Sequence, residues 1–536
     1  MMMSRGGDPR DGTFGAGLYA LTAGGLAQFG DIDPGYFGIR RFPYSTDPAK
    51  NGLRFRHISD DAALPDTAVN PGPSFNFNSE PHNAGEVWAE MLWEVYNVLI
   101  DEHAYDEAHR RMSDYVVAGL LLTPPEATYT EARDAILAAA GALDTDDMLL
   151  IAAAFAGRGA GTCAVAPPQT SFNFIGVVES GTIAAKLVTS TATLVDDGAS
   201  CDHDGYLDPG ESGTLHLTIA NNGVVAAEQV VATATTTSAG VTFGKPVTIA
   251  KIDPLSQVDI AIPVRIAATA PVNTSLDISV AVNADAGCNT GKLVVAFHER
   301  MGVDEVAASQ TTDGFETRTL AWTRTGALAE TFWNRAAGIG ANHVLFGTDA
   351  PFPTDTQVVS PVLQASPTAP LVVTVKHAYD LETAGPFGPF FDGAVVEVSS
   401  DGGATWRDVT QVGVDPQYPV VISPDDPANP LQGRNGFGGQ SPGFPALQPL
   451  SLNFGTQFAG QAVQIRFRLV SDFCCNATGW TLDDIAVTGT VNKPFPGLVA
   501  ETARCTALAP ASEPADSDVL EVRQMPFNSL DGVPVE

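Results

Sequence analysis

The most specific chemical pattern in this sequence is an acidic run of twelve residues, Ser200-Cys-Asp-His-Asp-Gly-Tyr-Leu-Asp-Pro-Gly-Glu211. Side-chain oxygens stand at its first, third, fifth, ninth and twelfth positions, a glycine stands at the sixth, and the seventh offers a backbone carbonyl. This is the spacing of a calcium-binding loop. An acidic surface turn is the alternative, because serine replaces the usual first aspartate and the flanking residues favour strands over helices. We expect a structural calcium ion held by Ser200, Asp202, Asp204, Tyr206, Asp208 and Glu211.

A second candidate is His82, which lies in a polar turn just ahead of an amphipathic pattern. Apolar residues recur after it at three- and four-residue spacing, which predicts a helix with one broad buried face. A histidine at the edge of such a core is more often structural or simply exposed than functional. The predicted face consists of Val87, Trp88, Met91, Leu92, Val95, Val98 and Leu99.

The residues around His82 resemble those of the fungalysin-type secreted zinc metallopeptidases. That family carries a His-x-x-Gly-Glu-Val-Trp-Ala run that opens a long helix, and residues 82–89 match it. Three further segments match in the same order, at residues 36–47, 128–137 and 154–159. The resemblance covers about residues 1–180 and implies the C-terminal subdomain of a peptidase catalytic domain.

The resemblance also implies roles for individual residues. In the family, the histidine that matches His82 donates a hydrogen bond to the oxyanion that forms on a peptide carbonyl, which stabilises charge only as it develops. Glu80 is a nearby carboxylate that could orient the ring. Arg40, with Arg41 as its rival, stands where related peptidases place an arginine against a substrate carbonyl. A surface or salt-bridging role is the alternative for either arginine.

The zinc motif of that family does not occur in the sequence. It is His-Glu-x-x-His, in which two histidines one helical turn apart bind zinc and the glutamate is the general base. None of the nine histidines stands in such a motif, and His298-Glu299 lacks the second histidine. By family order the zinc helix would come just before Met1. We therefore expect this chain to hold no zinc and to be inactive alone, either as a piece of a longer peptidase or as one half of a split enzyme.

Composition limits the remaining functions. The chain has 536 residues, 62 acidic against 28 basic, and a formal net charge of −34, which argues against nucleic acid and anionic membranes as partners. No apolar run reaches the ~18 residues that a membrane span needs. Residues 1–10 contain no apolar signal region, so a secreted location is expected from the resemblance and the composition alone.

Six cysteines permit disulfides in an oxidising compartment. Cys201 and Cys288 bracket a β-rich segment, and they are the pair we expect to bond. Of the adjacent Cys474 and Cys475, at most one easily reaches Cys163 or Cys505.

The chain divides into four parts by pattern. Helical periodicity runs from Gly85 to about Ala156, with a capping box at Thr128 and Glu131. Strands are then predicted at 187–195, 213–221, 229–236, 259–266 and 276–282, with Asn221-Asn-Gly223 as a hairpin turn. The expected fold is multidomain: a mainly α remnant of a metallopeptidase catalytic domain at 1–180, an Ig-like β-sandwich at 187–296, a β jelly roll at 297–491 and an acidic, proline-rich tail at 492–536.

The third part resembles MAM-like or carbohydrate-binding jelly-roll modules. The resemblance is carried by Ser-x-Asp-Gly-Gly-x-x-Trp at 399–406 and Gly-Trp-x-x-Asp-Asp-Ile at 479–485. Such modules often bind a structural calcium ion, for which the candidates are Asp392, Asp472, Asp483 and Asp484. The function implied for the whole chain is extracellular proteolysis of protein or peptide substrates. The alternative is a non-catalytic secreted protein whose β domains bind glycans or proteins.

Overall fold

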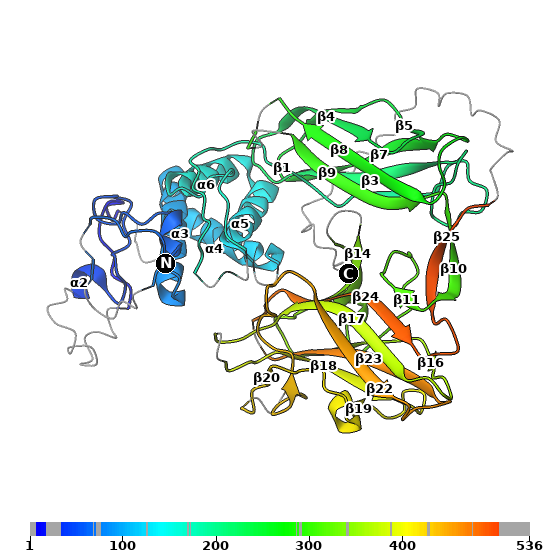
Figure 1. Ribbon diagram of the computed structural model, residues 1–536. Helices are drawn as coiled ribbons and strands as arrows, with labels where there is room; N and C mark the ends of the chain where they lie inside the picture. The colour runs from blue at the N-terminus through cyan, green and yellow to red at the C-terminus, as the bar shows by residue number, and fades with distance from the viewer. Residues whose placement is uncertain are drawn as a thin grey trace.

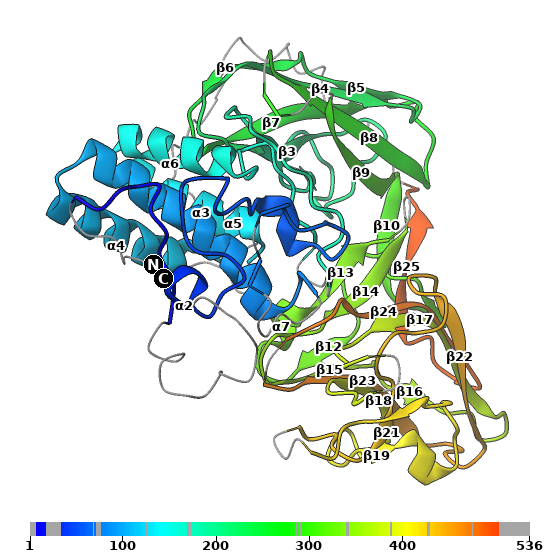
Figure 2. The same cartoon turned by 90° about the vertical axis from the view of Figure 1, so that its left-hand side faces the viewer.

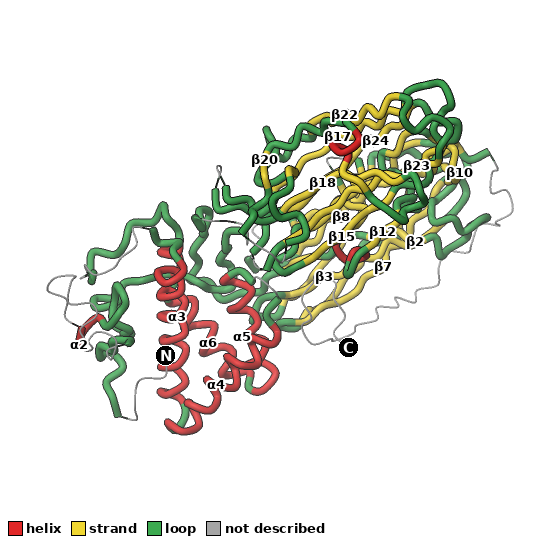
Figure 3. The backbone as a smooth tube through the Cα atoms, turned by 90° about the horizontal axis from the view of Figure 1, so that it is seen from below, coloured by secondary structure: helices red, strands yellow, loops and turns green. Residues whose placement is uncertain are grey.

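The chain folds as a helical region followed by two β regions (Figure 1). The structure, a computed structural model, describes residues 7–17, 34–67, 69–70, 77–124, 127–168, 171, 173–285, 287–288, 292–338, 342–385, 388–425, 429–473 and 475–502. We call residues 7–180 the helical region, 187–301 the first β region and 303–500 the second β region. Seen from below, the long helices lie together at one end and the strands at the other (Figure 3). The predicted order of helices before strands is confirmed.

Local sequence signals set the helix ends. Thr128 Oγ1 accepts a hydrogen bond from the Glu131 amide and the Thr128 amide donates to Glu131 Oε2, which confirms the predicted capping box. Asp144 caps the helix that begins at Thr145, because its side chain accepts hydrogen bonds from the backbone amides of Asp146 and Asp147. The described helices of this region are α2 (Pro34–Phe37), η2 (Phe55–Ile58), α3 (Pro81–Glu102), α4 (Tyr105–Leu122), α5 (Tyr129–Leu143) and α6 (Thr145–Gly157).

Helix α3 is buried on nearly all sides, not on the single face that its sequence predicts. Val87, Leu92 and Leu99 are buried as expected, but Trp93, which lies outside that face, is also fully buried. The ring of Trp93 packs against Phe14, with the ring centroids 4.7 Å apart, and against Tyr44. The segment before α3 therefore supplies a second layer of core that periodicity could not reveal.

The first β region consists of two antiparallel sheets that share one apolar core. One sheet has the order β1-β3-β7-β5 with β2 paired to β3, and the other has the order β6-β4-β8-β9. Alternate residues of the long strands are buried, as expected for sheets covered on one face. The strands are β1 (Leu187–Thr189), β2 (Thr193–Val195), β3 (Ser212–Asn221), β4 (Ala227–Thr236), β5 (Val241–Phe243), β6 (Val247–Ile252), β7 (Ser256–Ile266), β8 (Thr274–Asn283) and β9 (Leu293–Met301).

The predicted hairpin at Asn221 is wrong. Strands β3 and β4 flank it, but they belong to different sheets, so the turn crosses from one layer to the other. Asn221 stabilises this crossing: its side chain donates to the carbonyls of Val225 and Ile252 and accepts from the Gly223 amide. Asn-Gly is a local turn signal, and local signals do not reveal which strands pair.

The second β region also has two large sheets around one core, with orders β13-β14-β24-β17-β22 and β12-β15-β23-β18-β19. Strands β18 and β19 pair across the turn that contains Asp401, within the motif at 399–406. The elements are β10 (Val303–Gln310), β11 (Thr312–Asp313), β12 (Thr323–Thr325), α7 (Ala329–Phe332), β13 (Trp333–Ala337), β14 (His343–Thr348), β15 (Thr354–Val359), β16 (Leu363–Gln364), β17 (Leu371–Asp380), β18 (Gly393–Ser399), β19 (Arg407–Asp408), η3 (Val409–Val412), β20 (Val420–Val421), β21 (Asn435–Gly436), β22 (Gln448–Gly455), β23 (Ala462–Ser471), β24 (Gly479–Thr488) and β25 (Phe495–Ala500).

Strand β25 lies inside the range 492–536 that was expected to be a tail. It pairs antiparallel with β10, and the two strands form a ribbon between the two β regions (Figure 2). The expectation of a loose tail is therefore wrong for residues 495–500, and residues 503–536 lie outside the described residues.

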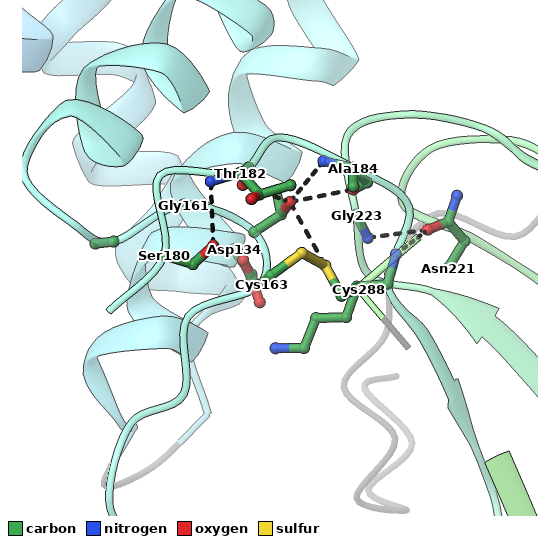
Figure 4. The surroundings of a disulfide bond; sticks show 12 residues. Asp134, Gly161, Cys163, Ser180, Thr182, Ala184, Asn221, Gly223 and Cys288 are labelled. Atoms are coloured by element: carbon green, nitrogen blue, oxygen red, sulfur yellow. Dashed lines mark hydrogen bonds between the residues drawn. A yellow bond between two sulfur atoms is a disulfide. The ribbon is translucent and has the colours of Figure 1, made fainter. Parts of the chain in front are cut away.

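A disulfide joins the helical region to the first β region. Cys163 bonds to Cys288, with the Cα atoms 5.0 Å apart (Figure 4). The predicted pair of Cys201 with Cys288 is wrong, and Cys201 takes part in a different disulfide. Cys288 follows β8, and its amide donates to the Ala185 carbonyl, whereas Cys201 lies in the loop before β3, where the Leu207 carbonyl accepts from the Gly302 amide at the other end of β9. Cys474 and Cys505 lie outside the described residues.

Candidate functional site

His82 lies at the first turn of α3, where Glu80 is the N-cap. One oxygen of Glu80 accepts hydrogen bonds from the amides of His82 and Asn83, and the other lies 2.7 Å from His82 Nδ1. Pro81 occupies the first helical position, where a missing N–H costs nothing. The same carboxylate thus starts the helix and orients the imidazole. The His82 side chain remains 77% exposed and open to a ligand.

The electrostatics of this pair favour a charged Glu80. Desolvation alone would raise the pKa of Glu80, but hydrogen bonds from the His82 ring and from two backbone amides outweigh it and lower that pKa. A carboxylate at Nδ1 holds a proton on that nitrogen, so Nε2 is the atom left for a substrate. When the ring is doubly protonated, Nε2–H can donate a charge-assisted hydrogen bond to an anionic oxygen.

The two candidate arginines occupy different environments. Arg40 is half-buried beside His82, and its Nη1 donates to the His82 carbonyl over 3.1 Å. Arg41 is buried, and its guanidinium donates to the side chains of Glu86 and Asn78 and to the Asn83 carbonyl. The bonds of Arg41 support the salt-bridging alternative for that residue, and Arg40 remains the candidate for an arginine that binds substrate.

Buried ion pairs hold the matched segments against α3. Glu86 binds Arg41 and also accepts from the Phe42 amide, so it fastens the segment at residues 41–42 to the helix. One turn later, the fully buried Glu90 pairs with Arg158 over 2.7 Å. Desolvation raises the pKa of Glu90 well above its usual range, and the charge of Arg158 opposes that rise.

Arg158 links three parts of the helical region. Its guanidinium also donates to the carbonyls of Ser45, Asn51 and Leu53, so it connects the end of α6 with the loop before η2 and with α3. The sequence contains Arg158 in one of its matching segments, but nothing in the spacing shows that it contacts the helix that follows His82.

The described residues do not fit a zinc ion in the helical region. Three groups of acidic side chains among them could hold a metal ion, and none of these groups contains a histidine or lies in this region. No step of peptide hydrolysis is therefore assigned to zinc here.

The loop predicted to bind calcium does gather carboxylates, but not the whole predicted set. Oxygens of Asp202 and Asp204 come within 4.8 Å of each other and of Asp196, which precedes the twelve-residue run. Asp208 instead joins Asp202 and Glu501, which is far away in sequence. Glu501 could not have been found from the spacing.

Glu211 and Ser200 organise this loop from within. Glu211 is buried, and its carboxylate accepts from the amides of Cys201 and Asp208, while Ser200 Oγ donates to Asp196. The carbonyl of Tyr206 is placed by a left-handed Gly205 and by a hydrogen bond from the Tyr206 amide to Asp204. Ser200 and Glu211, the first and last of the predicted calcium ligands, therefore hold the loop in shape through hydrogen bonds within it.

Four buried carboxylates meet at one end of the second β region. Oxygens of Glu382, Asp392 and Asp472 lie within 4.8 Å of one another. Asp349 interacts with Asp392, and burial together with the Asp349 charge raises the pKa of Asp392 to about 11. The four carboxylates come from both large sheets. Asp349 and Glu382 follow β14 and β17 of one sheet, and Asp392 and Asp472 flank β18 and β23 of the other.

Two of the four predicted aspartates belong to this cluster and two do not. Asp483 accepts from the Asn342 side chain, and Asp484 pairs with Lys376. Asp349 and Glu382 carry no sequence signal, since acidic residues at strand ends are common in so acidic a chain.

Comparison with known proteins finds that the helical region is similar to part of the fungalysin-type metallopeptidases. The family model for fungalysin metallopeptidase (M36) matches residues 21–164. An extracellular metalloproteinase of Aspergillus terreus is 33% identical over 138 residues, which are 23% of this chain and 19% of that protein. One from Neosartorya fischeri is 32% identical over 156 residues, 26% of this chain and 22% of the relative. Extracellular metalloproteinase 9 of Coccidioides posadasii is 31% identical over 172 residues, 30% of this chain and 22% of the relative.

These matches define a fungalysin-type metallopeptidase region in the first part of the chain. They span about a fifth of the length of each relative. Among solved structures, the secreted serine protease VesC from Vibrio cholerae aligns over 53% of this chain and 49% of its own chain. The TM-score is 0.19 and the identity 11%, values too low to define a shared fold. In the part of the chain that the structure describes, no helix is long and apolar enough to cross a membrane.

Proposed function

We propose that this chain contributes the oxyanion-binding wall of an extracellular zinc metalloendopeptidase that acts on protein or peptide substrates. The arrangement of Glu80, His82 and Arg40 at the start of α3, inside the fungalysin-type region, carries this proposal. The relatives are named as extracellular metalloproteinases, which supports both the reaction class and a secreted location.

In this proposal His82 is the residue that meets the developing charge. As a nucleophile adds to a peptide carbonyl, the carbonyl oxygen becomes anionic, and Nε2–H of His82 donates to it while Nδ1–H remains bonded to Glu80. Arg40 binds a second carbonyl of the peptide and so fixes its direction. An interaction that strengthens with the charge of the transition state lowers the barrier more than it tightens substrate binding.

Hydrolysis by the native protein tests the proposed reaction. The protein is tagged in its source organism, purified from the culture medium and assayed on an unstructured protein such as casein. We expect hydrolysis that 1,10-phenanthroline abolishes and added zinc restores. The 536-residue chain made alone is the matched control, and we expect it to be inactive because it lacks the zinc motif. Native protein that shows no chelator-sensitive hydrolysis would overturn the proposal.

We also propose structural calcium at the loop of residues 200–211 and at the cluster of Asp392 and Asp472. The loop ligands are Asp202, Asp204 and Asp208 with the Tyr206 carbonyl, and Ser200 and Glu211 hold the loop in shape. Carboxylate oxygens in this number suit a hard cation such as Ca²⁺, which takes six to eight oxygen ligands. We infer further that residues 187–296 form an Ig-like β-sandwich and residues 297–491 a jelly roll, each stabilised by one of these ions.

A further inference from the structure

The calcium loop of the first β region touches the C-terminal ribbon of the second. The Gly302 amide, between β9 and β10, donates to the Leu207 carbonyl in the loop over 3.1 Å. The Glu501 amide, directly after β25, donates to the Gly302 carbonyl over 3.1 Å. Three segments that are far apart in the sequence therefore run side by side at this point, where the ribbon of β10 and β25 leaves the first β region (Figures 1 and 2).

Carboxylates from both β regions converge on this contact. One oxygen from each of Asp202, Asp208 and Glu501 lies within 4.8 Å of the other two. Asp208 is only 4% exposed, and its Oδ1 has no hydrogen-bond partner. A buried carboxylate oxygen without a partner is costly, and a cation bound to this atom would remove that cost.

The charges at this contact repel one another as they stand. Asp208 is buried, its amide donates to the carboxylate of Glu211, and one of its own oxygens lies within 4.8 Å of an oxygen of Glu501. Asp304, on β10, brings a further carboxylate next to Glu501. Like charges at this spacing destabilise the contact unless a cation lies between them.

We propose that a divalent cation bound by Asp202, Asp208 and Glu501 clamps the ribbon of β10 and β25 to the first β region. This inference rests on the proposed calcium loop and adds that the site is complete only when the C-terminal end of β25 is docked. Calcium is the class of ion that such oxygen ligands select. The clamp makes the junction of the two β regions depend on the calcium concentration, because the bound ion holds the regions together. When the ion is lost, the junction keeps its direct hydrogen bonds, such as the one from the Arg318 amide to the Tyr206 hydroxyl.

Calcium titration of Glu501→Gln tests the clamp. The full chain is used in an Asp392→Asn background, which silences the buried cluster of the second β region. Glu228→Gln, an exposed glutamate on β4, is the matched control. Calcium affinity is measured by calorimetry, and backbone hydrogen exchange is followed for residues 302–306 and 497–501.

We expect Glu501→Gln to weaken calcium binding at least about 10-fold and Glu228→Gln to leave it unchanged. In the parent protein, calcium should slow exchange in both segments, and in Glu501→Gln it should not. Unchanged affinity in Glu501→Gln would overturn the clamp and leave the calcium loop standing. A parent protein that binds no calcium would overturn the loop and the clamp together, and neither result bears on the peptidase proposal, which chelator-sensitive hydrolysis tests.

Discussion

The Nδ1 atom of His82 lies 2.7 Å from Oε1 of Glu80, the residue that also caps α3. The backbone amides bind one carboxylate oxygen and the imidazole binds the other. The start of the helix and the direction of the ring are therefore set by one side chain, and substitutions at Glu80 can separate the two roles.

Replacing Glu80 with glutamine should lower turnover without destabilising the helix. The amide oxygen of glutamine can still accept from the backbone, whereas the charge that holds the proton on Nδ1 is lost. We expect the hydrolysis rate of the native enzyme to fall about 10-fold, with little change in thermal stability. Glu80→Ala should show the same loss of rate and also lose about 1 kcal/mol of stability with the cap. Equal rates for wild type and Glu80→Gln would show that Glu80 does not position His82.

Replacing Arg158 with alanine should unfold the helical region at markedly lower denaturant. The change leaves the carboxylate of Glu90 buried without its partner, and breaking a buried pair in this way costs about 3 to 5 kcal/mol. Urea unfolding followed by tryptophan fluorescence measures the loss. Arg110→Ala is the control, because Arg110 pairs with Glu107 on the exposed side of α4 and should contribute less than about 1 kcal/mol. Equal losses for the two variants would contradict the role assigned to Arg158.

His57 should make the helical region sensitive to acid. Burial and the charge of Arg56 lower the pKa of His57 to about 4, and its Nδ1 accepts from the Arg54 amide. The unfolded chain binds the proton near pH 6.5 and the folded protein only near pH 4. Stability should therefore fall by up to about 3 kcal/mol as pH drops through that window, and level off below it.

His57→Asn isolates this effect, since the asparagine oxygen can replace Nδ1 as acceptor but does not titrate. Urea unfolding at pH 7, 6, 5 and 4 should show a smaller loss in the variant. A loss as large as in wild type would assign the acid sensitivity to other groups.

Asp392→Asn should change stability in opposite directions with and without calcium. In chelator the variant should melt higher than its parent, because the parent must take up a proton on Asp392 to fold, whereas asparagine is neutral in both the folded and the unfolded state. In calcium the parent should melt higher, because it keeps all of its ligands. Differential scanning calorimetry in a Glu501→Gln background reduces the contribution of the other proposed calcium site. Curves that do not cross between the two conditions would argue against an ion at this cluster.

Sequence patterns predicted local structure well and long-range contacts poorly. The capping box at Thr128 was found because helix caps depend on residues within one turn. The same reasoning failed for Asn221, whose turn has hairpin residues but joins two sheets, and for the predicted disulfide, whose two cysteines lie at opposite ends of one domain. Spacing along the chain cannot report on either relationship.

The candidate sites show the same limit. The helix that begins beside His82 could be predicted from a short motif, and the approach of Asp202 to Asp204 from the regular spacing of the acidic residues in their loop. Glu501 reaches that loop only because β25 pairs with β10, and Arg158 reaches Glu90 only because α6 packs beside α3. Such residues follow from the tertiary fold and carry no local signal.

The turnover of His82→Ala tests the central claim most directly. The measurement is kcat and KM of native secreted enzyme on a quenched peptide, for wild type, His82→Ala and the exposed control His109→Ala. We expect kcat to fall about 100-fold in His82→Ala with KM nearly unchanged, as for the loss of an oxyanion donor, and both constants to be unchanged in His109→Ala. An unchanged kcat in His82→Ala would contradict the proposed role of His82 in stabilising the oxyanion.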